Sequence, residues 1–107
     1  MIFEFKISKD ISVKDKPIQV IISSKLTKEF EPDLLSIVDE SKKHADHNLD
    51  AVKGGTHFRV KIVSKKFQGM SKLERHRWVY TVLNDEIKGG VHALALTTHD
   101  PDENSGG

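Results

Sequence analysis

The chain has 107 residues, 36% of them hydrophobic and 31% charged, which is typical of one globular domain with a single core. No apolar run reaches the roughly 20 residues of a membrane-spanning helix, and the N-terminus lacks the pattern of a secretory signal, so we expect a cytoplasmic protein with no membrane contact. The net charge of +1 argues against a general nucleic-acid binder. Cysteine is absent, which excludes disulfides, thiol nucleophiles and thiolate metal ligands from this chain.

We predict three segments: an N-terminal extension at 1–16, whose brief alternation could also form an edge strand, one domain at 17–99, and a disordered acidic tail at 100–107. The domain begins with a predicted helix that starts at Pro17 and ends near Phe30. Five apolar side chains share one face of this helix: Ile18, Ile21, Ile22, Leu26 and Phe30.

Two strands are predicted next, separated by a polar loop that spans residues 42–55. The first covers residues 34–41, where Leu35 and Ile37 alternate with Ser36 and Val38. The second covers residues 56–64 and has a clearer alternation. Its apolar face carries Phe58, Val60 and Ile62, and its other face carries His57, Arg59 and Lys61.

A second helix is predicted to begin after Ser71, because Ser71 and Glu74 have the spacing of a capping box. Its predicted buried stripe consists of Leu73, His76, Tyr80, Leu83 and Ile87. Gly89 and Gly90 are expected to end the helix, and a last strand follows at residues 91–98.

The predicted order is αββαβ, an α+β fold with a three-stranded mixed sheet. A loop joins the first two strands, which favours antiparallel pairing, whereas a helical crossover joins the second and third, which favours parallel pairing. This arrangement places the end of the first strand and the starts of the other two at one edge. The histidines expected to gather there are His44, His47, His57 and His92.

Five sequence blocks, in this order and spacing, resemble the BolA family. They are ES-x-x-H at 40–44, THFRVKIVS at 56–64, F-x-G at 67–69, RHR-x-VY at 75–80 and VHALAL at 91–96. The loop form HADH resembles that of the bacterial subgroup with an HAGH loop. The resemblance implies a fold similar to the class II KH fold and a role as partner of monothiol glutaredoxins in iron–sulfur cluster handling. It also implies the older role given to the family, that of a transcriptional regulator associated with morphology and stress.

In the resemblance, His92 and His44 are the positions that ligate a 2Fe-2S cluster shared with glutaredoxin and its bound glutathione. Imidazoles can replace two thiolates on one iron, and a chain without cysteine has only imidazoles to offer. No cofactor is expected in the isolated protein, which we expect to be a monomer or a weak homodimer.

Several alternatives remain for the histidines. His92 has a purely structural interpretation as a strand-end residue that caps the core, and His47 is the reserve loop ligand, which with Asp46 and His92 would suit an adventitious zinc site. His57 is expected to be an outward-facing neighbour. His76 is expected to be a hydrogen-bonded core histidine, and His99 to be free in the tail.

The region from 59 to 77 is strongly basic and predicts a second binding surface, for DNA or for an acidic glutaredoxin surface. The residues proposed for it are Lys65, Lys66, Lys72, Arg75 and Arg77. FQGM is not the GxxG loop of KH domains, which weakens a nucleic-acid role. No catalytic motif is present, so we expect a protein that is not an enzyme.

Overall fold

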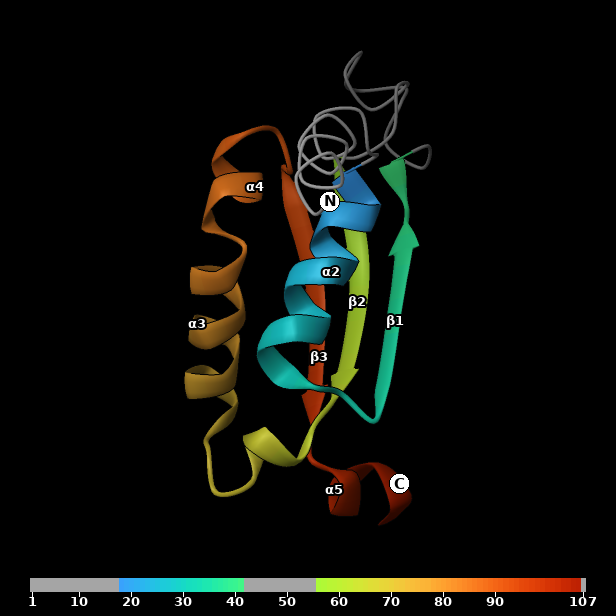
Figure 1. Ribbon diagram of the computed structural model, residues 1–107, viewed down its shortest axis with the longest axis vertical. Helices are drawn as coiled ribbons and strands as arrows, with labels where there is room; N and C mark the ends of the chain where they lie inside the picture. Colours follow the sequence, from blue (N-terminus) through green and yellow to red (C-terminus); the bar gives the residue numbers. More distant parts are fainter. Residues whose placement is uncertain (1–17, 42–55, 107) are drawn as a thin grey trace, which may run out of the picture.

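The computed structural model of the protein describes residues 18–41 and 56–106. Figure 1 shows helices packed beside a single sheet. The elements in chain order are α2 (Ile18–Phe30), β1 (Leu34–Asp39), β2 (His57–Val63), the short 3-10 helix η3 (Lys65–Phe67), α3 (Lys72–Val82), α4 (Asn84–Lys88), β3 (Ala93–His99) and α5 (Pro101–Gly106). No described helix is long and apolar enough to cross a membrane.

The sheet has the order β1-β2-β3, with β2 in the centre. Strand β1 pairs antiparallel with β2, and the register places Asp39 opposite Phe58. Strand β3 pairs parallel with β2, and here His57 lies opposite Ala93. The predicted α+β fold with a mixed sheet is therefore confirmed, because a loop and a helical crossover impose the two pairing directions.

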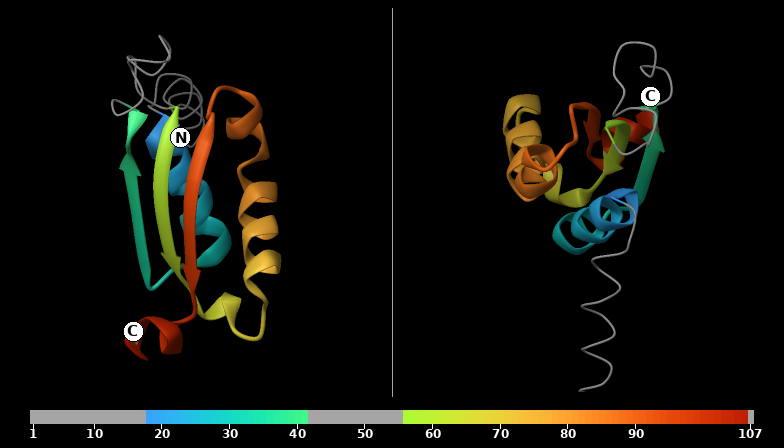
Figure 2. Two further views of the ribbon diagram at one scale, coloured as in Figure 1. Left: turned by 180° about the vertical axis from the view of Figure 1, so that it is seen from behind. Right: turned by 90° about the horizontal axis from the view of Figure 1, so that it is seen from above.

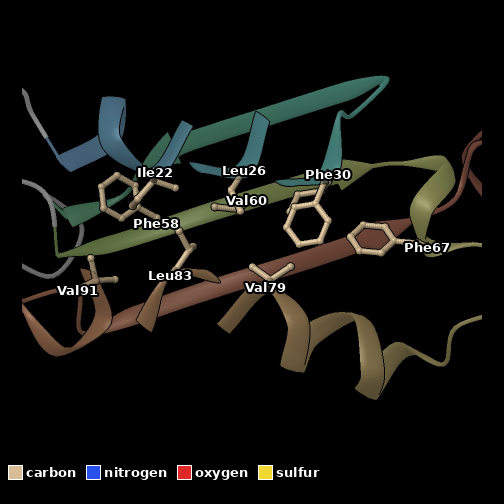
Figure 3. Close-up of a cluster of buried hydrophobic side chains, with 10 residues drawn as sticks. Ile22, Leu26, Phe30, Phe58, Val60, Phe67, Val79, Leu83 and Val91 are labelled. Atoms are coloured by element: carbon tan, nitrogen blue, oxygen red, sulfur yellow. The ribbon is translucent and has the colours of Figure 1, made fainter. Parts of the chain in front are cut away.

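The core lies between the sheet and the helices α2 and α3 (Figure 3). Helix α2 contributes Ile22, Leu26 and Phe30, none of which is exposed, as its spacing predicted. Strand β2 contributes Phe58, Val60 and Ile62 from the face that its alternation predicted. Both elements thus bury the face that the hydrophobic pattern predicts.

Helix α3 begins as predicted, because Ser71 and Glu74 form a complete capping box. The predicted buried stripe is wrong in phase, however. The side chains that the helix and its end bury are Arg75, Val79 and Leu83, whereas Leu73 is 59% exposed and Tyr80 is 42% exposed. The rotation has a physical reason: Arg75 can enter the interior because its guanidinium group is hydrogen-bonded on several sides.

The predicted helix is divided in two at Leu83, which ends α3 and starts α4. Gly89 caps the end of α4, as predicted, and its N–H donates to the carbonyl oxygen of Asp85. A Cβ atom at Gly89 would lie 3.0 Å from that same oxygen. Gly90 has a φ of 141°, which favours glycine as the chain turns toward β3.

The prediction of a disordered tail at 100–107 is wrong for residues 101–106, which form α5 directly after Asp100. Asp100 and Glu103 cap this helix reciprocally, since each backbone N–H donates to the other residue's carboxylate. Glu103 also binds Arg75, which joins α5 to the body of the protein. His99 ends β3 and is half-buried, so it is not a free tail residue. The predicted extension at 1–16 lies outside the described residues.

Candidate functional site

The sheet topology brings the start of β2 next to the chain that enters β3. His92 lies one residue before β3, and its N–H donates to the carbonyl oxygen of Thr56 at 2.7 Å. The N–H of Ala93 donates to the same oxygen at 3.1 Å. These two bonds fix the backbone of His92 against the start of β2.

The rings of His57 and His92 are neighbours at this edge of the sheet, with centroids 5.9 Å apart and an interplanar angle of 42°. His92 is exposed and His57 is half-buried. The structure therefore brings these two histidines together, as the topology predicted. His44 and His47, together with Asp46, lie outside the described residues.

A buried serine, which the sequence analysis missed, holds the start of β2. The Ser41 hydroxyl accepts from the backbone N–H groups of Thr56 (2.9 Å) and His57 (3.2 Å) and donates to Asp39 (2.5 Å). Ser41 is only 1% exposed. Short hydroxyl side chains often bond to nearby backbone, but these two N–H groups are 15 and 16 positions away from Ser41 in the sequence, so no spacing in the sequence marked it.

The ring of His57 has a defined neighbour, since its Nδ1 lies 2.8 Å from the Thr56 hydroxyl oxygen. Such a bond on one ring nitrogen orients an imidazole, which is how many metal-binding histidines are positioned. With metal–nitrogen bonds of about 2.0–2.1 Å, two imidazoles on one tetrahedral metal have centroids about 5 Å apart. The observed separation of the His57 and His92 centroids is somewhat larger than this value.

A complete metal site would need ligands from elsewhere. Within residues 18–41 and 56–106, no group of three or more histidine, cysteine, aspartate or glutamate side chains could hold a metal ion. The sequence contains no cysteine. The arrangement can thus supply imidazole ligands at one edge of a shared site, and thiolates would have to come from another molecule.

The predicted basic surface lies near the opposite end of β2. Lys65 is exposed in η3, which follows the end of β2, and Lys72 is exposed at the start of α3 (Figure 1). Lys66 is partly engaged, because its ammonium group bonds the Glu29 carbonyl and pairs with Glu31. Strand β2 has seven residues, so about 20 Å separate the two regions.

Arg75 is not part of an exposed basic surface, contrary to the prediction. It is 6% exposed, and its guanidinium group donates to the carbonyl oxygens of Met70 and Thr98 and to the Glu103 carboxylate. The guanidinium group also lies over the ring of Phe67. The N–H groups of Arg75 thus bond within the fold. Of the other residues proposed for the basic surface, Lys65, Lys72 and Arg77 are exposed and make no ion pair among the described residues.

His76 is half-buried on α3, but its Nε2 is buried without a hydrogen-bond partner among the described residues. The expectation of a hydrogen-bonded core histidine is therefore wrong for this atom. Burial lowers the pKa of His76, and the nearby charges of Lys72 and Arg75 lower it further. The ring is thus held neutral by its surroundings and does not point to a binding role.

A family model described as BolA-like protein matches residues 26–103. The chain is 48% identical over 83 residues to Protein BOLA1, chloroplastic, of Arabidopsis thaliana, which covers 74% of this chain and 51% of that protein. It is 40% identical over 86 residues to the DNA-binding transcriptional regulator BolA of Haemophilus influenzae, covering 80% of each chain.

A solved structure of BolA1 from Arabidopsis thaliana gives a TM-score of 0.73 at 43% identity, and it covers 82% of this chain and 96% of that chain. The protein described here thus spans about half the length of the curated plant relative but nearly all of the chain in that structure.

Proposed function

Because the chain belongs to the BolA-like protein family, we propose that it is a non-enzymatic adaptor that binds a monothiol glutaredoxin and shares a 2Fe-2S cluster with it. In this proposal the protein acts in the cytoplasm, in the assembly or trafficking of iron–sulfur clusters and in iron or stress regulation. Alone, it carries no cluster and is a monomer or a weak homodimer.

The observation that supports the proposal is the exposed His92 ring beside a second histidine at one edge of the sheet. Two imidazoles can occupy two of the four protein positions of a 2Fe-2S cluster, as they do in Rieske centres. This chain cannot supply the other two as thiolates, because it has no cysteine. A partner that brings its own cysteine and glutathione completes the ligand set.

His92 is the proposed anchor of the cluster, and His44 is the proposed second ligand on the basis of the family resemblance, with His47 in reserve. His92 suits this role because its backbone is fixed by the bond to Thr56 while its ring is exposed. His57 lies close enough to influence the cluster through its own ring. The test therefore also asks which histidine supplies the second imidazole ligand.

The test is to reconstitute the complex with a monothiol glutaredoxin and record its visible circular dichroism. His92→Ala should change the spectrum, and so should His44→Ala, while His76→Gln, on a distant helix, serves as the matched control. Substitution of His47 and His57 identifies any replacement of His44. Because ligating imidazole must be unprotonated, the cluster should also be lost faster at pH 6 than at pH 8. A spectrum that every histidine variant leaves unchanged would refute histidine ligation.

A second candidate function is DNA binding, favoured by the name of the Haemophilus influenzae relative. The exposed residues Lys65, Lys72 and Arg77 would then contact phosphates at the end of the domain opposite the histidines. The discriminating measurement is sequence preference at physiological salt, since charge attraction alone is not selective. Alanine substitution of these three residues should weaken binding about equally for all DNA sequences, whereas His92→Ala should leave binding unchanged.

A further inference from the structure

Within residues 18–41 and 56–106, helices α2 and α3 pack on only one face of the sheet. Helices α2 and α3 both pack on the buried face of β2, and the view from behind shows the strands in front of α2 with α3 beside β3 (Figure 2). The strand registers place eleven residues on the opposite side. Val63 is buried and His99 is half-buried at the end of this side. The other nine form what we call the open face: Leu34, Ser36, Val38, His57, Arg59, Lys61, Ala93, Ala95 and Thr97.

On the open face, β3 carries small side chains and the central strand β2 carries charged ones. Strand β3 presents only small side chains there, from Ala93, Ala95 and Thr97, all of them exposed. The central strand presents Arg59 and Lys61, of which Arg59 is held by Glu40 at 2.9 Å. Lys61 makes no ion pair among the described residues, so a positive charge is left for a partner.

The β1 side of the open face is more apolar than water-facing strands usually are. Leu34 is 41% exposed and Val38 is 47% exposed, and Ser36 lies between them. Antiparallel strands with one solvated face normally alternate apolar and polar residues, with the polar set outward. Exposed aliphatic groups beside cations and small side chains are typical of a surface that a protein partner covers.

The open face is continuous with the histidine edge, because His57 belongs to both. Arg59 follows two residues after His57 on the same side of β2, and Ala93 follows His92 directly. The exposed lysines at Lys65 and Lys72 lie instead beyond the far end of β2, about 20 Å from His57. A partner that reaches the histidine edge would therefore meet the open face before those lysines.

We propose that the open face is the docking surface for the cluster-sharing protein, and that the partner's contact region combines a carboxylate for Lys61 with apolar side chains that lie on Ala93, Ala95 and Val38. This inference rests on the proposed function and adds the surface that performs it. The face offers no phenylalanine, tyrosine or tryptophan on which a nucleic-acid base could stack, which favours a protein over a single-stranded nucleic acid.

The test measures the dissociation constant of the apo-complex with a monothiol glutaredoxin by calorimetry, using the full chain. Ala95→Glu adds bulk and negative charge beside Arg59, where the fold tolerates it, and Lys61→Glu reverses the central charge. Each should raise the dissociation constant at least tenfold. Two matched controls, Ala95→Ser on the same face and Arg77→Glu on α3, should change it less than twofold. Far-UV circular dichroism confirms that each variant is folded.

The outcomes separate the two proposals. If Ala95→Glu and Lys61→Glu bind like the wild type while His92→Ala alters the cluster spectrum, the docking surface is refuted and the proposed function stands. If Arg77→Glu weakens binding more than either open-face variant, the partner uses α3 and the docking surface is likewise refuted. If the wild type binds no monothiol glutaredoxin, both proposals fail.

Discussion

Arg75 at the start of α3 and Glu103 in α5 form a charged hydrogen bond of 2.6 Å across 28 positions of sequence. The arginine is buried, whereas the glutamate side chain is 47% exposed. The pair fastens the C-terminal helix to the end of β3, since the same guanidinium group also donates to the Thr98 carbonyl oxygen. The final turn of the chain is therefore part of the folded domain.

Replacing Arg75 with methionine should destabilise the protein by more than about 3 kcal/mol, because hydrogen bonds to charged groups contribute about 1.5–3 kcal/mol each and several are lost together. The methionine keeps most of the buried aliphatic volume, so the change reports mainly on the polar contacts. Urea unfolding followed by tryptophan fluorescence measures it. Arg77→Met, two positions further on an exposed site, is the control and should lie within about 0.5 kcal/mol of the wild type.

The loss of protein stability at acidic pH should depend on Glu103. The hydrogen bond from Arg75 lowers the pKa of this carboxyl group, with a further contribution from the backbone N–H of Asp100. Its contribution to stability is present above the unfolded-state pKa of 4.5 and is lost as the pH falls through the lower folded-state pKa. Melting temperatures from pH 6 to pH 2.5 should therefore fall less steeply for Glu103→Gln than for the wild type. Parallel curves would contradict this assignment.

Near neutral pH, protonation of His76 should lower the stability of the folded protein. Because its folded-state pKa lies below the unfolded value of 6.5, the unfolded chain binds the proton more tightly, and stability falls as the pH drops below that value. His76→Gln should flatten the change in melting temperature between pH 8 and pH 5.5. A wild-type slope in His76→Gln would contradict this assignment.

The phase of α3 can be tested with two leucines. Leu83 is 1% exposed and Leu73 is 59% exposed, although both belong to the apolar stripe that the sequence predicts to be buried. Leu83→Ala should cost about 2–5 kcal/mol through lost burial and the cavity that remains, whereas Leu73→Ala should change stability by less than about 0.5 kcal/mol. Equal effects in chemical denaturation would restore the predicted phase.

The phase error shows what sequence patterns can and cannot provide here. The strands were predictable because Phe58, Val60 and Ile62 alternate cleanly and because connection length limits the pairing direction. The inward position of Arg75 was not, because hydrophobic periodicity assigns arginine to the surface and its partner is distant in the sequence. The same pair, with the reciprocal caps of Asp100 and Glu103, explains why an acidic segment forms α5.

The histidine edge was predictable in outline for the same reason. Topology alone places His57 beside the start of β3, and the rings are indeed neighbours. The role of Ser41 was not evident, because it depends on two backbone N–H groups that approach it only in the folded sheet. Hydroxyl groups that satisfy distant backbone donors leave no periodic signal in a sequence.

Ser41→Ala should therefore loosen the start of β2. Two buried N–H groups would lose their acceptor, which costs about 1–3 kcal/mol per unsatisfied group. Hydrogen exchange at the amides of Thr56 and His57 should become faster than at Val60, in the middle of the strand. Ser36→Ala, on the exposed side of β1, serves as the control and should leave exchange at both amides unchanged.

The parallel pairing of β2 with β3 has a consequence for a chain during its synthesis. β1 and β2 can associate as soon as they have left the ribosome, but β3 cannot join them until η3, α3 and α4 have been translated and have crossed the sheet. His57 and His92 consequently meet only after β3 has joined the sheet. A nascent chain that has not been translated as far as His92 would present the His57 ring alone, and a partner that requires both rings would not bind it.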